Sequence, residues 1–178
     1  MPNLSVRPIQ EADIAPLADY WFHASPEFLI GMGVDLSKMP ERVQWEQMLL
    51  TQIGQPFPEK QSYCIIWEID GQASGHCNIN KITFGKEASM HLHMWQSPSR
   101  QKGLGAQLVR MSLPFFFENY SLEVLNCEPY ALNPAPNKTL EKVGFQWIKE
   151  YITTPGWINF EQPVNLWQLT REQFLQLP

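Results

Sequence analysis

The stretch PSRQKGLGAQLVR, residues 98–110, places two basic residues and two close glycines just before an abrupt apolar run with helical spacing. The first backbone N–H groups of a helix have no partner inside the helix and lie at the positive end of its dipole. Gly103 and Gly105 would let the backbone approach a phosphate, and Arg100 and Lys102 would add positive charge. The stretch predicts either a phosphate-binding loop or an ordinary strand–helix connection.

Two common phosphate-binding motifs are absent from this stretch. It lacks the G-K-[ST] ending of a P-loop, and the G-x-G-x-x-G pattern of dinucleotide-binding folds does not occur. The identity of the anion therefore has to come from the rest of the chain.

The composition is that of a globular protein of one domain. The 178 residues are 44% apolar and 17% charged, with a net charge of −5. An acidic chain lacks the basic excess that nucleic-acid binding requires, so we expect no nucleic-acid partner. Three scattered cysteines, no signal-peptide pattern and no apolar run near ~18 residues predict a soluble, cytoplasmic protein with no membrane partner.

The hydrophobic pattern predicts an α/β protein with a mixed sheet and helices on its faces. Asp70–Gly71 is a hairpin signal, Pro114 predicts the end or a kink of its helix, and Gly144 predicts a left-handed helix cap. Residues 24–39 read as a loop. The predicted strands are 4–9, 62–69, 73–82, 89–95, 122–130, 145–152 and 164–170, and the predicted helices are 11–22, 40–53, 104–113 and 133–143.

In four places the chain resembles the GCN5-related N-acetyltransferase (GNAT) superfamily. RQKGLG at 100–105 matches the family pattern Q/R-x-x-G-x-G/A, and VRPIQEAD at 6–13 resembles the opening strand and helix start. NPAPNKTLEKVGF at 133–145 resembles the segment in which an Asn precedes a helix ending in E-K-x-G-F. NLWQLTREQF at 165–174 is similar to the last strand of members that acetylate protein N-termini or amines.

The resemblance implies a single N-acetyltransferase domain over residues 1–178. The sheet would be mostly antiparallel, with helices on both faces and two splayed central strands that hold acetyl-CoA, the expected cofactor, between them. Backbone groups of Met94 and Trp95 would bind the pantetheine, and Asn133 would contact the cofactor arm, beside a helix that carries Asn137 and Lys138. The residues expected around the pyrophosphate are Arg100, Gln101, Lys102, Gly103, Leu104, Gly105 and Ala106.

The chain departs from the family pattern at two positions. Many members carry a Ser where this chain has Pro136, and others carry a Tyr that acts as general acid where it has Leu140. The usual proton donors for the leaving thiolate are therefore absent. Tyr130 could take that role from the end of the preceding strand, or it could be a packing residue.

Histidines gather on one predicted face of the meander. His91 and His93 lie on one side of their strand, and His76 and Asn78 lie on one side of the strand before it. If Asn78 pairs with His91, antiparallel register sets His76 opposite His93. A histidine here could act as the base for acyl transfer to an amine or orient the acceptor, directly or through water.

Two other interpretations of these histidines remain open. They could form a hydrogen-bonded polar patch without chemistry. A His-x-His strand with a third His beside it is also a zinc-site pattern, which would make the protein a metal hydrolase.

The predicted function is acetyl-CoA-dependent N-acetyl transfer by direct attack in a ternary complex. The acceptor would be a small-molecule amine or a protein N-terminus, and the loop at 24–40 would shape its pocket. The protein would be a monomer or a homodimer, with no bound metal. The alternative is a CoA-binding sensor or regulatory module without turnover, which the missing Ser and Tyr favour.

Overall fold

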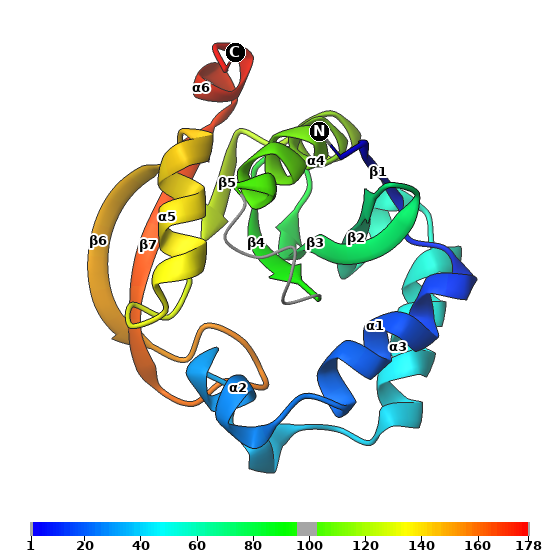
Figure 1. The fold of residues 1–178 in the computed structure, drawn as a ribbon. Helices are drawn as coiled ribbons and strands as arrows, with labels where there is room; N and C mark the ends of the chain where they lie inside the picture. Colours follow the sequence, from blue (N-terminus) through cyan, green and yellow to red (C-terminus); the bar gives the residue numbers. More distant parts are fainter. Residues whose placement is uncertain (1, 96–102, 178) are drawn as a thin grey trace.

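A computed structural model describes residues 2–95 and 103–177. The strands form one seven-stranded sheet in the order β1-β2-β3-β4-β5-β7-β6 (Figure 1), and every neighbouring pair is antiparallel except β4 and β5. The strands are β1 (Leu4–Pro8), β2 (Ser62–Ile69), β3 (Gln72–Thr83), β4 (Glu87–Met94), β5 (Val124–Cys127), β6 (Gln146–Thr153) and β7 (Gln162–Thr170). The predicted mixed, mostly antiparallel sheet is confirmed.

Helices cover both faces of the sheet. The α-helices are α1 (Ile14–Phe22), α2 (Pro26–Gly31), α3 (Arg42–Gly54), α4 (Leu104–Asn119), α5 (Pro134–Val143) and α6 (Arg171–Leu175), with short 3₁₀ turns at η1 (Glu11–Asp13), η2 (Leu36–Lys38) and η3 (Phe57–Glu59). In the part of the chain that the structure describes, no helix is both long and apolar enough to cross a membrane.

The alternation of side chains along β2 divides the core in two. Tyr63, Ile65 and Trp67 pack in a cluster with α4 and α5, whereas Cys64 and Ile66 pack in a cluster with α1, α2 and α3. Figure 1 shows α1 beside α3, away from α4. Because successive strand residues point to opposite faces, every second residue of β3 and β4 is directed toward the α1 side.

The expected loop at residues 24–39 and the expected helix end at residue 113 were wrong. Residues 24–39 contain α2, which begins because the Ser25 hydroxyl accepts the Phe28 amide and Pro26 occupies the first helical position. The helix around Pro114 does not end there, since α4 continues to Asn119. Burial of the Phe116 and Phe117 side chains outweighs the missing backbone hydrogen bond, a loss of ~3 kcal/mol.

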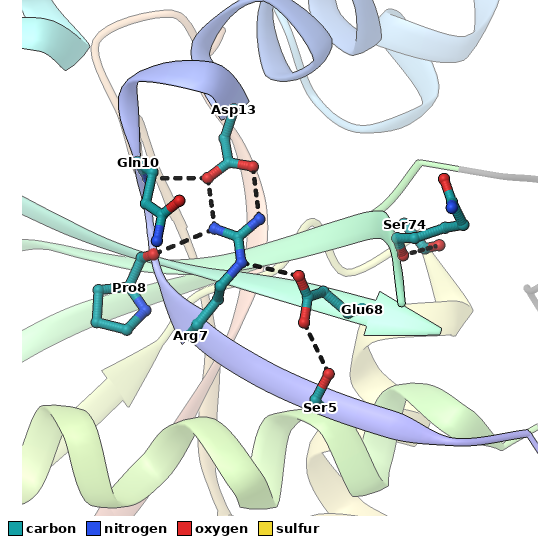
Figure 2. A network of polar contacts seen from close by, with 8 residues as sticks. Ser5, Arg7, Pro8, Gln10, Asp13, Glu68 and Ser74 are labelled. Atoms are coloured by element: carbon teal, nitrogen blue, oxygen red, sulfur yellow. Dashed lines mark hydrogen bonds and ion pairs between the residues drawn. The ribbon is translucent and has the colours of Figure 1, made fainter. Parts of the chain in front are cut away.

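An ion-pair network fastens β1 to η1 and β2 (Figure 2). The Arg7 guanidinium donates to both Asp13 carboxylate oxygens, at 2.6 and 2.8 Å, and to Glu68 at 2.8 Å. Glu68 also accepts from the Ser5 hydroxyl, and Asp13 accepts from the Gln10 amide. Glu68 is thus part of a structural network.

Asp13 is 4% exposed, so its charge depends on these partners. Burial acts to raise the Asp13 pKa, but hydrogen bonds from Arg7 and Gln10 and the charge of Arg7 outweigh it, and the pKa lies below the ordinary value. A pKa that is lower in the folded state stabilises the protein above the unfolded pKa of about 4, and this stabilisation is lost as the pH falls through the folded value.

We predict that Asp13→Asn lowers the free energy of unfolding at pH 7 by about 1–3 kcal/mol, because it leaves Arg7 partly unpaired. Urea unfolding between pH 3 and pH 7 measures this. The difference between wild type and variant should shrink as the pH falls below about 4, because Asp13 is protonated in the unfolded state before it is protonated in the folded state.

Glu150→Gln is the control, since Glu150 is an exposed acid on β6. A loss of stability as large in Glu150→Gln as in Asp13→Asn would contradict the role given to the Arg7 network.

Candidate active site

The two central strands separate where the expected cofactor gap lies. β4 pairs with β5 only from Glu87 to Met90, although β4 continues to Met94, and Figure 1 shows the two arrowheads diverging. The Trp95 amide donates to the Ser74 carbonyl at 2.8 Å. Backbone groups alternate in direction along an antiparallel strand, so those of Leu92 and Met94 point away from β3, toward the gap.

The backbone of Met94 has the direction expected for contact with the pantetheine, whereas the backbone amide of Trp95 does not. Met94 was expected to offer backbone groups to the pantetheine, and its backbone has the required direction. Trp95 was expected to do the same, but its amide is bonded to Ser74 within the sheet. Leu92, which sequence reasoning did not select, is the second residue of β4 with its backbone toward the gap.

The start of α4 has the backbone that a phosphate-binding turn requires. Gly103 precedes the helix with φ 73°, the left-handed conformation that favours glycine. A Cβ on Gly103 would meet nothing within 4 Å, and one on Gly105 would meet only Thr139 of α5, at 3.7 Å. Leu104 is buried and Ala106 is half-buried. Arg100, Gln101 and Lys102 lie outside the described residues.

The expected cofactor residues of α5 have different surroundings. Asn133 begins the helix, where its side chain accepts from the Ala135 amide at 3.4 Å, and Lys138 is exposed. The Asn137 amide group donates to two backbone carbonyls and accepts from Trp167 and Asn165. A bond from Asn137 to the cofactor would therefore have to replace one of these four.

The predicted register of the histidine face is confirmed. Asn78 pairs with His91, and His76 pairs with His93. The imidazole rings of His76 and His93 stack, with centroids 4.8 Å apart and planes at 23°. Asn78 is half-buried between Cys64 of β2 and His91 of β4. Burial of Cys77 and Met90 in the α4 cluster confirms that this polar face points to the α1 side.

His76 and His91 are held in the neutral state. His76 is 3% exposed, and its Nδ1 accepts from the Trp95 indole at 2.7 Å. Burial, helped by the nearby His91, lowers the His76 pKa to about 3. Burial, helped by the charge of Lys81, lowers the His91 pKa to about 4, and His91 Nε2 lies 3.2 Å from Asn80 Oδ1.

His93 has a different set of neighbours. Its Nδ1 lies 3.2 Å from the hydroxyl of Tyr20, a residue of α1, and its ring meets the Trp21 ring edge-on at 4.9 Å. Sequence reasoning did not select Tyr20, because the residue lies beside the buried stripe of α1. Its position next to Trp21 in YWF was the only signal in the sequence, and that signal does not distinguish Tyr20 from a packing residue.

A cavity of about 290 Å³ opens beside these rings. Aromatic side chains and one carboxylate line it, so it could accept an organic amine. Three of its residues come from the segment 24–39, as expected for an acceptor pocket. The lining residues are Asp19, Tyr20, His23, Ala24, Ser25, Phe28 and Trp95.

Tyr130 lies at the start of the α5 segment. It bridges to Val164 of β7, and its ring meets Phe160 edge-on at 5.9 Å. Leu140, at the family's tyrosine position, is fully buried in the α4 cluster. Tyr130 is therefore held in place by Val164 and Phe160 and remains a candidate proton donor. These contacts, within the described residues, do not join it to the histidines.

The histidines do not converge as metal ligands. Over residues 2–95 and 103–177, no group of three or more His, Cys, Asp or Glu side chains could hold a metal ion. The rings of His76 and His93 are stacked, and one nitrogen of His76 already accepts from Trp95.

Comparison with known proteins identifies the family. The family model described as "Acetyltransferase (GNAT) domain" matches residues 3–146. The chain belongs to this family. It is therefore an acetyltransferase by family, with acetyl-CoA as the family's cofactor. A search of the curated proteins found no match.

Solved structures of other GNAT proteins share the fold at low identity. RimL, a ribosomal-protein alpha-N-acetyltransferase in complex with coenzyme A, is 12% identical with a TM-score of 0.76, over 96% of this chain and 95% of its own. Spermidine N-acetyltransferase from Vibrio cholerae, with CoA and spermine, is 14% identical with a TM-score of 0.77, over 97% and 98%. Aminoglycoside acetyltransferase AAC(6')-Ib, with coenzyme A and kanamycin, is 16% identical with a TM-score of 0.74, over 98% of both chains.

Gly75 keeps the two histidine-bearing strands close in this GNAT domain. A Cβ at Gly75 would lie 2.6 Å from the His93 carbonyl oxygen and 2.9 Å from the buried Trp67 ring. We predict that Gly75→Ala lowers the free energy of unfolding by about 1–3 kcal/mol, because neither neighbour can move freely. Urea unfolding measures the change.

Gly54→Ala is the matched control, since a Cβ at Gly54, the last residue of α3, would meet nothing within 4 Å. It should change stability by less than about 0.5 kcal/mol or raise it. Equal effects of the two substitutions would show that close packing at Gly75 is unimportant.

Proposed function

We propose that this GNAT domain transfers the acetyl group of acetyl-CoA to a primary amine that attacks the thioester directly in a ternary complex. The acceptor is a small-molecule amine or a protein N-terminus. The observation that carries the proposal is the position of β4, whose backbone borders the gap toward β5 while its His93 side chain contacts Tyr20, a residue that lines the cavity at α1.

The cofactor side of the proposal rests on the gap and on the start of α4. The left-handed Gly103, where a Cβ would meet nothing within 4 Å, leaves room for a pyrophosphate at the helix N-terminus. Gly105 and the side chains of Arg100, Gln101 and Lys102 would complete the phosphate site. The Leu92 amide, directed to the gap, would polarise the thioester carbonyl as negative charge develops on its oxygen. Asn133 and Lys138 would hold the cofactor arm from α5.

The acceptor side favours His93 as the base. His76 and His91 are poor proton acceptors near neutral pH, because their pKa values are lowered to about 3 and about 4. His93 stands next to the cavity-lining Tyr20 and can take a proton from the entering ammonium group. His76, His91 and Asn78 would then fix the ring and its surroundings.

The reaction balances as follows. An ammonium proton moves to His93, and its N–H electron pair stays on nitrogen. That pair forms the C–N bond, the C–S electron pair leaves on the CoA sulfur, and a second amine proton passes to water as the amide forms. The thiolate gains a proton, for which Tyr130 is the candidate donor, replenished from solvent.

The setting of the enzyme also belongs to the proposal. We infer that residues 1–178 form one domain, because both core clusters among the described residues pack on the same seven-stranded sheet, one on each face. Three buried free cysteines and the need for acetyl-CoA favour the cytoplasm, and the enzyme would act as a monomer or homodimer.

The test is release of free CoA thiol from acetyl-CoA over a panel of polyamines, aminoglycosides and peptides with free N-termini. Acceptor-dependent release supports the proposal. Calorimetric binding of CoA with no release from any acceptor would support the sensor module, and no binding at all would refute both.

For the cofactor site, we predict that Gly103→Ala weakens CoA binding about tenfold or more, because a methyl group enters the space of the phosphate and a left-handed alanine is strained. Isothermal titration calorimetry with CoA measures the affinity.

Gly85→Ala is a closely matched control. Gly85 has the same φ of 73° and the same open space at Cβ, but it lies in the β3–β4 turn. The two variants should lose similar stability, and only Gly103→Ala should lose CoA affinity. Equal affinity in both variants would refute the phosphate site.

For the base, we predict that His93→Gln lowers kcat by roughly 10²–10⁴-fold and removes the acidic limb of the pH–rate profile. The KM for acetyl-CoA should stay unchanged, because the ring lies on the acceptor side. Steady-state kinetics from pH 5 to pH 9 measure both.

His91→Gln is the comparison, since His91 lies on the same face of the same strand. With its pKa already at about 4, His91 does not titrate in this range, so the variant should keep the acidic limb. Loss of the acidic limb in His91→Gln would instead identify His91 as the base.

A further inference from the structure

Among the described residues, two possible partners lie within reach of the Tyr20 hydroxyl. It lies 3.2 Å from Nδ1 of His93 and 3.3 Å from the sulfur of Met32. Its ring also contacts the rings of His76 and Trp95, with centroids 6.0 and 6.5 Å away. One residue of α1 thus reaches the histidine pair from the side opposite the strands.

The two stacked histidines have different kinds of hydrogen-bond partner at Nδ1. The Trp95 indole N–H, bonded to Nδ1 of His76, can only donate. A proton on that Nδ1 would face another N–H, so His76 must keep Nδ1 unprotonated. A tyrosine hydroxyl can either donate or accept, so it imposes no such restriction on Nδ1 of His93.

Met32 allows the hydroxyl to reverse its direction. While Nδ1 of His93 is unprotonated, Tyr20 can donate to it. Once the ring is an imidazolium, both nitrogens carry protons, and Nδ1 must donate to the Tyr20 oxygen. The hydroxyl proton then turns to the Met32 sulfur, a weak acceptor that is already in place.

We propose that Tyr20, with Met32 as its alternate acceptor, is a positioning residue that allows His93 to take the proton of the acceptor amine. This inference rests on the proposed function. The amine proton bonds to Nε2 of His93 and its electron pair stays on the amine nitrogen. Only the tautomer with its proton on Nδ1 can take a proton at Nε2, and in that tautomer Nδ1–H donates to Tyr20 before and after the transfer, so the charged ring keeps its orientation.

Few titratable groups face His93 in the described part of the chain. They are Tyr20 from α1 and His76 from β3, with His91 two residues earlier on β4. Asp19 of α1 and His23, the residue after α1, line the cavity together with Tyr20. Asp19 lies 3.6 Å from His23 and pairs with Arg42 at 2.7 Å. Among the described residues, Tyr20 is thus a group placed to stabilise a proton on His93.

The test compares Tyr20→Phe, which keeps the ring and removes the hydroxyl, with Met32→Leu, which keeps the volume and removes the sulfur. Nitrogen-15 NMR of the histidine rings follows the titration of His93 without any need for turnover. We expect the His93 midpoint to move to lower pH by about one unit in Tyr20→Phe, because the imidazolium loses its acceptor. In Met32→Leu the shift should be smaller and in the same direction.

Kinetics then connect the hydroxyl to the reaction. Tyr20→Phe should lower kcat about tenfold or more, move the acidic limb of the profile to lower pH, and leave the KM for acetyl-CoA unchanged. In the His93→Gln background, Tyr20→Phe should have no further effect. Tyr151 lies on the far strand β6, and its hydroxyl is bonded to Glu128. Tyr151→Phe removes this hydroxyl and should match wild type.

The outcomes separate this inference from the proposed function. An unchanged or raised His93 midpoint in Tyr20→Phe would overturn the inference, as would an undiminished effect in the His93→Gln background. If wild type releases no thiol with any acceptor, the proposed function fails, and the NMR titration still decides whether Tyr20 stabilises a proton on His93.

Discussion

The pairing register of β3 and β4 is the constraint on which the site depends. Side chains alternate across a sheet, so a slip of one residue would turn His76 and His93 into the α4 core and Cys77 and Leu92 toward the cavity. The close contact at Gly75 opposes such a slip. The energy that holds the register comes from burial of apolar side chains on the α4 face, and the polar side chains on the other face follow from it.

The geometry of a strand explains how β4 can serve two substrates at once. Backbone groups of a strand point within the plane of the sheet, whereas side chains stand perpendicular to it. Once β5 leaves after Met90, the in-plane edge of β4 becomes a lining for a cofactor, while His93 stands toward α1. The reacting groups of donor and acceptor can therefore meet at one short segment without competing for the same atoms.

The three histidines show how the surroundings of a side chain decide its chemistry. All three project from the same face, yet burial and an indole donor keep His76 neutral, and burial beside Lys81 does the same for His91. His93 instead faces a hydroxyl that can reverse its hydrogen bond. A histidine can take up a proton only if its hydrogen-bond partner can accept from the new N–H group. The neighbouring side chain therefore decides which of these histidines can act as a base.

The sequence by itself determined the order of the strands and of α1, α3, α4 and α5, the hairpin at Asp70–Gly71 and the opposition of His76 to His93, because these depend on local turn chemistry and on side-chain alternation. It also determined the family, through short motifs that keep their order along the chain. It did not indicate α2 or α6. Only the tertiary structure decided that Tyr20 reaches His93, that the Trp95 amide is bonded to Ser74, that Asn137 is committed to four bonds, and that α4 passes through Pro114. These contacts join residues far apart in sequence or depend on how a whole helix face is buried, and no local pattern carries that information.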